Sequence, residues 1–334
     1  DDHLTNRELP YYYWQQYYTL MSNYGSYASY FIDTSTPFDQ QMCMFDDTRT
    51  WQQYFLQAAI TNYENVTAIW QEARLAGFQL SQEDQDYLDE LDGQITVAAA
   101  SYSYGSADEY LQMAYGPAAT LTSYHAFVER QITASAYLQV LVDEKPYTED
   151  DISKYYDDNA DSYAGNGIEK SDVKMVNVRH ILIQPEGKND DGTYTDEAWA
   201  EAEKKANDLL TEWQNGEHTE DSFAFMAAEN SQDPGSVENG GLYEDIYPGK
   251  MVDEFDAWCF DPARQPGDTG IVKTSYGYHI MYFSSTGEHA YWYVRAEEDY
   301  LNELSVSVLQ EVAAKFEVTE SEQNAAIVDI MQQN

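Results

Sequence analysis

The chain has 334 residues, with 60 acidic and 17 basic side chains, and its formal net charge at pH 7 is −43. This charge excludes a nucleic acid as partner and disfavours direct adsorption to an anionic membrane, because phosphates and anionic headgroups would be repelled. The length allows two or three domains, and 43% apolar residues is the composition of a globular protein.

The same sequence gives no sign of a membrane span, a metal or a cofactor. No apolar run approaches the roughly 20 residues that a spanning helix needs. Cys43 and Cys259 are best interpreted as two unrelated thiols, and no Cys/His cluster has the spacing of metal ligands. The first residue is Asp1 rather than methionine, which indicates that an N-terminal segment has been removed or left out. Whether that segment was a signal or a membrane anchor stays open.

Helical periodicity dominates residues 1–165. Apolar and aromatic side chains recur at helical spacing in residues 9–27 and 54–70. Gly116-Pro117 predicts the end of a short helix and the start of a longer one that runs through Val142. Serine or threonine followed by acidic residues predicts helix N-caps at three places: Ser81, Ser106 and Thr148.

Tyrosine is unusually frequent, with 30 residues in the chain, and eight of them fall between Tyr11 and Tyr30. These side chains can pack inside the helical region with their hydroxyls reaching solvent. They can also line a cradle for unfolded polypeptides, because tyrosine offers a broad amphipathic surface with few torsions to freeze. Both interpretations can hold for different tyrosines.

A flexible hinge at residues 163–167 precedes a change of period. From Val173 a β-branched run predicts a strand that ends at Ile183, and a helical pattern returns beyond Gly287. The elements predicted between them are a loop at 189–193, helices at 196–214 and from Thr219, a glycine-rich loop at 231–241, a short helix around Phe255, a turn at 267–270, and strands at 271–274 and 278–283. This succession predicts a small α+β unit.

Two histidines stand in strand-like contexts, His180 in Val-Arg-His-Ile-Leu-Ile and His279 in Tyr-Gly-Tyr-His-Ile-Met. Between them lie Asp233, in Ser-Gln-Asp-Pro-Gly-Ser, and the pair Gly240-Gly241. This order and spacing, over about 115 residues, resembles the parvulin family of peptidyl-prolyl isomerases.

The resemblance implies the roles of particular residues. His180, Asp233 and His279 match the family's catalytic positions, with aspartate as in extracytoplasmic foldases of the SurA and PrsA type. Met251 and Phe255 match residues that line the proline slot, and Thr274 matches a threonine beside the second histidine. These residue types suit the chemistry, since rotation about an X–Pro bond needs an apolar slot and polar groups that favour a twisted amide, and no metal or cofactor.

The sequence departs from the family after the double glycine, where Leu242-Tyr243-Glu244 replaces the usual Asp-Leu-Gly. Tyr243 is expected to line the slot where leucine is usual, and Tyr276 also falls where smaller residues are common. Either tyrosine could narrow the slot or weaken turnover.

Each of these residues also has a plainer interpretation. His180 and His279 could instead be core histidines with satisfied hydrogen bonds. Asp233 before Pro-Gly is a natural turn residue. Met251 and Phe255 would be core residues in most helices.

The resemblance also extends to the arrangement of domains along the chain. It implies a parvulin-like domain at 169–287, a small antiparallel sheet with surrounding helices, inserted in an all-α chaperone-like domain. That domain comprises residues 1–168 and a C-terminal helical segment, 288–334, packing on it. The expected function is isomerase and chaperone for exported polypeptides with X–Pro bonds, outside the cytoplasm and held at a membrane only through a removed anchor. The alternative is a non-catalytic holdase whose parvulin domain only binds.

Overall fold

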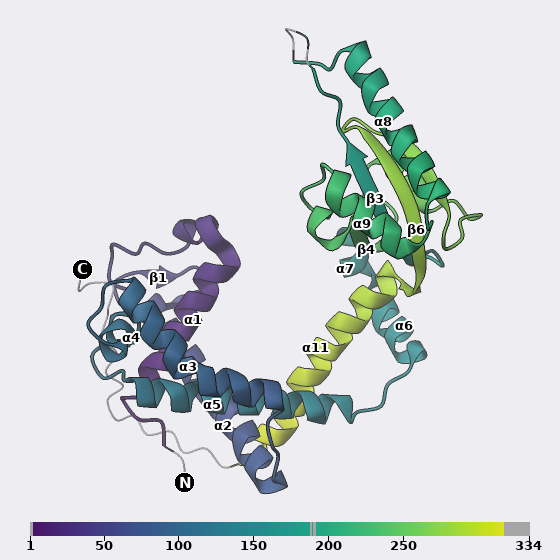
Figure 1. Ribbon diagram of the computed structural model, residues 1–334. Coiled ribbons are helices and arrows are strands. Elements are labelled where there is room, and N and C mark those ends of the chain that lie inside the picture. The colour runs from purple at the N-terminus through teal and green to yellow at the C-terminus, as the bar shows by residue number, and fades with distance from the viewer. Residues whose placement is uncertain (1–2, 188, 190–191, 317–334) are drawn as a thin grey trace. The chain divides into compact units, whose positions relative to one another are not determined.

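The computed structural model describes residues 3–187, 189 and 192–316. Part of the predicted loop at 189–193, and residues 317–334 of the predicted C-terminal segment, lie outside these ranges. The chain divides into two compact units, Asp1–Pro146 with Leu301–Asn334, and Tyr147–Tyr300. Figure 1 labels most of the elements of each unit. The α+β fold class is confirmed, since one unit is mostly helical and the other contains the sheet.

The first unit is built from helices packed on a core rich in aromatic rings. The N-caps expected at Ser81 and Ser106 are confirmed, because each side chain accepts a backbone N–H of the first turn. The long helix begins at Leu121, behind a capping box at Thr120, and not directly after Pro117. The helices are α1 (Leu9–Tyr24), α2 (Trp51–Ala76), α3 (Gln82–Ser101), α4 (Ala107–Tyr115), α5 (Leu121–Asp143) and the second half of α11 (Tyr291–Ala313).

A short hairpin interrupts this helical unit where the sequence predicts helix. It consists of β1 (Met42–Cys43) and β2 (Asp46–Thr50), which pair antiparallel. The threonines of β2 have strand propensity, but two strands of this length give too few alternating positions for a recognisable period.

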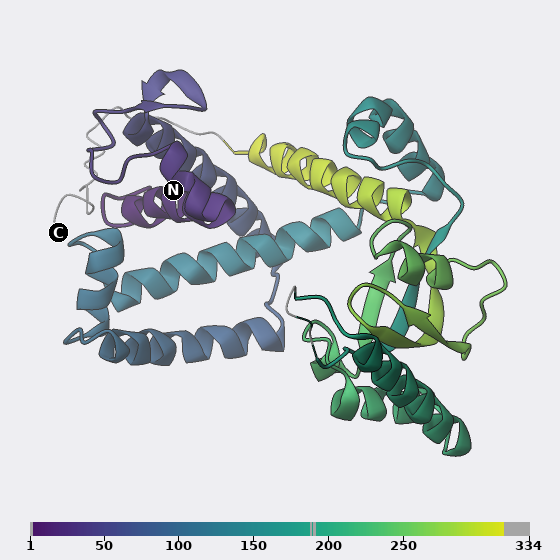
Figure 2. The ribbon, with the colours of Figure 1, turned by 90° about the horizontal axis from the view of Figure 1, so that it is seen from above.

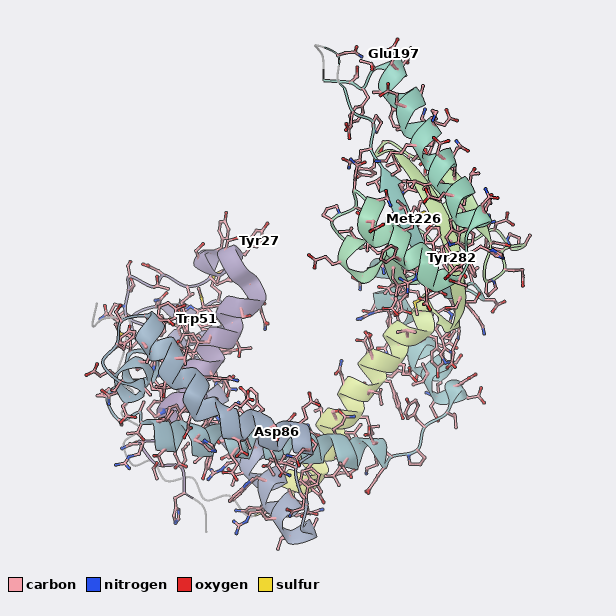
Figure 3. The ribbon with its side chains drawn as sticks, in the orientation of Figure 1. Tyr27, Trp51, Asp86, Glu197, Met226 and Tyr282 are labelled. Carbon is pink, nitrogen blue, oxygen red and sulfur yellow. The ribbon has the colours of Figure 1, made fainter. Side chains whose placement is uncertain are left out.

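The tyrosines of residues 11–30 differ in burial. Four of those on α1 are buried, and these are Tyr11, Tyr12, Tyr13 and Tyr17. Tyr27 and Tyr30 follow in a 3₁₀ helix at Gly25–Tyr30 and are 68% and 76% exposed. Figure 3 shows Tyr27 projecting away from the helices, whereas the labelled Trp51 is fully buried.

The second unit contains a four-stranded antiparallel sheet in the order β4-β3-β6-β5. The strands are β3 (Lys174–Ile183), β4 (Leu242–Ile246), β5 (Thr269–Lys273) and β6 (Tyr278–Ala290). The helices are α6 (Glu149–Asp158), α7 (Ala160–Gly165), α8 (Asp196–Asn215), α9 (Glu220–Asn230), α10 (Asp253–Cys259) and the first half of α11. The sequence predicts all of these strands except the edge strand β4, and β6 continues past the predicted end at residue 283.

The strand register decides which residues of β3 face which layer. Ile181 pairs with Ile280, and these two pack under α8 and α9 with Trp213 and Phe223. Figures 1 and 2 show these two helices on one side of the sheet. The next residue, His180, belongs to the opposite face, where α10 contributes a second core. Because β3 is buried on both faces, its apolar residues form a nearly continuous run.

Two further findings concern the cysteines and the length of the helices. Cys43 and Cys259 are both buried free thiols. Among the helices of the described ranges, none combines the length and apolar character needed to cross a bilayer.

Candidate active site

The strand register brings the two histidines together. His180 lies opposite Met281 and His279 lies opposite Leu182, so the histidines are diagonal neighbours on one face of the sheet. Their Nδ1 atoms are 3.0 Å apart and their rings are stacked, with centroids 5.2 Å apart. The side chains are only 2% and 6% exposed. Two residues that are 99 positions apart in the sequence therefore form one buried unit.

Asp233 joins this pair from the loop that follows α9. Its Oδ2 atom accepts hydrogen bonds from His180 Nε2 at 3.1 Å, Ser236 Oγ at 2.5 Å and Tyr243 Oη at 2.8 Å. Its other oxygen, Oδ1, has no hydrogen bond within the described residues. The side chain as a whole is 15% exposed.

Thr274 completes the network on the other side. Its Oγ1 is 2.9 Å from His279 Nε2 and accepts the backbone N–H of Tyr276 at 3.1 Å. When both imidazoles are neutral, the hydrogen bonds run in one direction. Thr274 donates to His279, His279 donates to His180, and His180 donates to the carboxylate of Asp233, which can only accept. Each hydrogen bond of this chain is thus donated in the direction of Asp233.

Apolar side chains border the network on the face of the sheet that α10 covers. Phe255 is buried and meets His180 and His279 edge-on, each with ring centroids 5.4 Å apart. Met251 is partly buried and packs against the same core. Tyr243 stacks on His180 at 5.0 Å, which gives its large ring and its hydroxyl defined partners.

Two positions show where the sequence was less informative. Tyr276 is 59% exposed, and its contact with the network is made by its backbone N–H. Ser236 was not among the predicted site residues, although it is 2% exposed and lies 3.0 Å from His180 Nε2. Its spacing was the available signal, because a serine three residues after an aspartate in a turn is well placed to hydrogen-bond its carboxylate.

Three members of the network have shifted pKa values: Asp233, His279 and Tyr243. The hydrogen bond from His180 is the main cause that holds the pKa of Asp233 well below its usual range, against the opposing effect of burial. Burial, with a smaller contribution from His180, lowers the pKa of His279 to about 3. Burial and then Asp233 raise the pKa of Tyr243 to about 12. At neutral pH Asp233 is therefore a carboxylate, and the His279 and Tyr243 side chains are neutral.

These shifts predict a loss of stability in acid. His279 has a folded pKa of about 3, whereas its unfolded value is about 6.5. The unfolded chain therefore binds more protons between these pH values, and the free energy of unfolding falls as the pH falls. We expect His279 to contribute a loss of about 1 to 2 kcal/mol between pH 7 and pH 5. Hydrogen exchange of the β3 backbone amides at the two pH values measures it.

The variant His279→Asn is the control, because asparagine does not titrate in this range. Its loss between pH 7 and pH 5 should be smaller than that of the parent by the amount given above. Equal losses in the two proteins would contradict a depressed pKa at His279. Comparing the two proteins also cancels the contribution of the carboxylates to the loss of stability, because both proteins contain the same carboxylates.

Comparisons with known proteins identify the second unit. Residues 166–285 match the family of the PPIC-type PPIASE domain. The foldase protein PrsA 1 of Listeria innocua is 31% identical over 106 residues, which are 32% of this chain and 29% of the relative. The foldase protein PrsA of a Geobacillus strain is 44% identical over 80 residues, 24% of this chain and 27% of the relative.

The chaperone SurA of Pseudomonas savastanoi is 35% identical over 107 residues, 32% of this chain and 22% of the relative. The matched segments thus span less than a third of the length of these three relatives. A crystal structure of PrsA from Bacillus subtilis aligns with 86% of this chain and 96% of that one, with 18% identity and a TM-score of 0.37. Residues 166–285 are therefore a parvulin-type, PPIC-type peptidyl-prolyl isomerase domain, in a chain related to the PrsA and SurA foldases.

Proposed function

We propose that the protein is a foldase that catalyses cis/trans isomerisation of X–Pro bonds in unfolded polypeptides. The observation that carries this proposal is the carboxylate of Asp233, which three donors hold by one oxygen, while its other oxygen makes no hydrogen bond within the described residues. The surrounding apolar residues Phe255 and Met251 supply a place for a prolyl ring.

The proposed mechanism uses the difference between a planar and a twisted amide. Amide resonance places negative charge on the carbonyl oxygen and gives the rotation barrier of about 18–20 kcal/mol. This charge is smaller in the twisted transition state. A fixed carboxylate beside the carbonyl, such as Asp233, therefore disfavours the planar form more than the twisted form, which lowers the barrier. His180 and His279 act as positioning residues, because they hold Asp233 and do not exchange protons with the substrate.

We extend the proposal to the rest of the chain. Residues 1–168 with 288–334 would form the chaperone-like part, and 169–287 the isomerase domain. The clients would be newly exported polypeptides that contain X–Pro bonds, outside the cytoplasm. The net charge of −43 supports a highly solvated protein whose clients are not nucleic acids.

The direct test is magnetisation-exchange NMR on short X–Pro peptides, with the full chain at catalytic concentration. We expect faster exchange between cis and trans peptides at an unchanged equilibrium ratio. Exchange at the uncatalysed rate would refute the isomerase proposal. Suppression of aggregation by a chain without isomerase activity would favour the non-catalytic holdase.

The role of Tyr243 can be tested by restoring the residue that is usual in the family. The variant Tyr243→Leu loses the hydrogen bond to Asp233 and the stacking on His180. We therefore expect kcat/KM for a short X–Pro peptide to fall about three- to tenfold, as for a lost hydrogen bond to a charged group that is partly exposed. A rise in kcat/KM would show instead that the tyrosine only narrows the slot. The variant Tyr243→Phe separates the two contacts, because it keeps the ring and loses the hydroxyl.

A further inference from the structure

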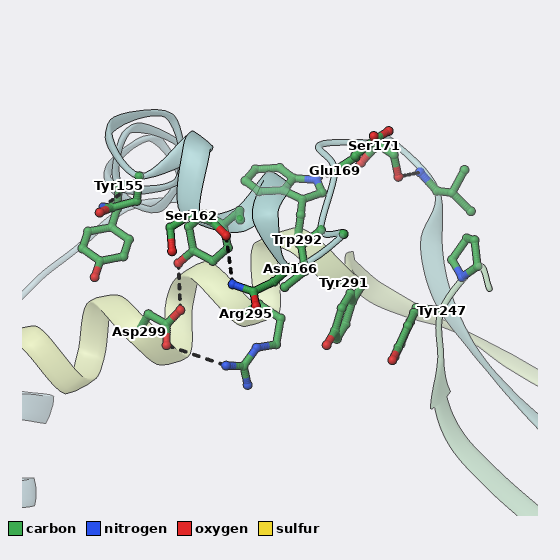
Figure 4. Close-up of a pocket in the computed structure, with 16 residues that line it drawn as sticks. Tyr155, Ser162, Asn166, Glu169, Ser171, Tyr247, Tyr291, Trp292, Arg295 and Asp299 are labelled. Carbon is green, nitrogen blue, oxygen red and sulfur yellow. Dashed lines mark hydrogen bonds and ion pairs between the residues drawn. The ribbon is translucent and has the colours of Figure 1, made fainter. Parts of the chain in front are cut away.

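A pocket of about 880 Å³ lies in the second unit, apart from the histidine network. It is bordered by α6, α7, the segment that leads into β3, the residues after β4, and the start of α11 (Figure 4). It shares no lining residue with the network described above. The proposed chemistry of the histidine network therefore does not account for the pocket.

Aromatic rings form much of its wall. Tyr247 and Tyr291 are stacked with their centroids 3.7 Å apart and their planes at 11°. Figure 4 shows these two rings side by side, with Trp292 next to them. Tyr155 and Tyr163 line the side formed by α6 and α7. Such ring faces carry a negative quadrupole and attract cations, the planar guanidinium group of arginine above all.

The charges in the pocket favour the same kind of ligand. Arg295 is its only lining cation among the described residues, and it already pairs with Glu298 and Asp299. Lys170 is not a lining residue, and its ammonium group pairs with Asp157 and lies over the ring of Trp292. Glu169 is an exposed lining carboxylate that makes no ion pair within the described residues. The pocket therefore has an excess of negative charge that a basic side chain would complement.

Strand β4 connects this pocket with the network. Tyr243 contacts Asp233 near the beginning of the strand, and Tyr247, which lines the pocket, follows its end. Four residues in extended conformation span at most about 13 Å. A client whose prolyl bond lies at Asp233 can therefore reach the pocket with a residue about four positions away. β4 is also an edge strand, and no further strand of the described residues pairs with it on that side.

We propose that the pocket is a second substrate subsite that binds an arginine or lysine side chain located about four residues from the prolyl bond. This inference rests on the proposed isomerase function and adds a preference for clients with basic residues. The occupied subsite raises kcat/KM because it holds the client in place at the reacting bond.

The test uses a set of peptides that share one X–Pro bond. Each peptide carries arginine, norleucine or glutamate at one position, which lies four residues before or four residues after the proline. Exchange NMR with the full chain measures kcat/KM for each. On one side of the proline we expect kcat/KM for the arginine peptide to exceed that for norleucine about three- to tenfold at low salt. High salt should reduce this ratio, because a partly exposed charge is screened. A ratio of one on both sides, with normal turnover of the peptides, would overturn the subsite and leave the isomerase proposal intact.

Two variants locate the effect. Glu169→Gln and Tyr291→Leu should each bring the arginine-to-norleucine ratio closer to one without changing turnover of a short peptide. The matched control is Glu217→Gln, which removes an exposed carboxylate that does not line the pocket. An unchanged ratio in both pocket variants would contradict the proposal.

If no peptide is isomerised, the proposed function fails and the subsite is tested by binding alone. Titration with the arginine peptide should then shift the indole N–H signal of Trp292, which donates to the Ser171 carbonyl at 2.8 Å. No shift with the arginine peptide, or an equal shift with the norleucine peptide, would overturn the subsite.

Discussion

Replacement of Asp233 by alanine is expected to lower kcat/KM for X–Pro peptides about 10- to 100-fold, the range for loss of one preorganised electrostatic group. The variant removes the carboxylate that we propose acts on the carbonyl of the substrate. It also leaves Tyr243 Oη and His180 Nε2 without the oxygen to which they donate. Exchange NMR on short peptides gives the rate directly, without a coupled protease.

Two further measurements separate the charge of Asp233 from its structural role. Asp233→Asn keeps the shape and removes the charge, so its kcat/KM should lie close to that of Asp233→Ala if the charge is decisive. Hydrogen exchange of the β3 amides should show that both variants remain folded. Full activity in the asparagine variant would refute the proposed electrostatic mechanism.

Replacement of Gly241 by alanine is expected to destabilise the second unit by about 2 to 4 kcal/mol. Gly241 has a φ of +76°, and a Cβ there would lie 2.2 Å from the backbone oxygen of His180. The glycine also accepts the His180 N–H at 2.8 Å, so the clash cannot be relieved without moving β3. The variant should lose isomerase activity together with stability, because the same strand carries the histidine.

The matched control for this prediction is Gly249→Ala. Gly249 has a similar φ of +86°, but nothing lies within 4 Å of the place that a Cβ would occupy there. This variant should be destabilised only by the left-handed backbone conformation, by about 1 to 2 kcal/mol. Urea unfolding followed by hydrogen exchange of β3 compares the two. Equal destabilisation would show that the close approach to His180 is unimportant.

The sequence predicted the site best where two strand patterns that are far apart in the chain could be paired with each other. His180 and His279 each stand in an apolar strand, and their diagonal contact follows from pairing those strands in register. Helix starts at Ser81 and Thr148 were predictable because an N-cap depends on only a few neighbouring residues. Asp233 was identified by its motif, although its three donors could not be read from that motif.

Other features escaped prediction because short elements carry too little pattern. The hairpin of β1 and β2 and the edge strand β4 have only a few residues each. The irregular pairing of β4 with β3 also interrupts its alternation. Ser236 was missed because a turn serine has many ordinary partners, and only the fold shows that its partners are Asp233 and His180.

The sequence by itself determined the α+β class, the strands that carry the histidines, and the aspartate that lies between them, because each depends on local periodicity or on a motif. The tertiary structure alone decided which tyrosines are buried, that Tyr243 donates to Asp233, and that five aromatic side chains from distant segments line one pocket. The physical reason is that hydrogen bonds, ring stacking and pKa shifts depend on distances between residues far apart in the chain. Those distances are fixed only when strand register and helix packing are set.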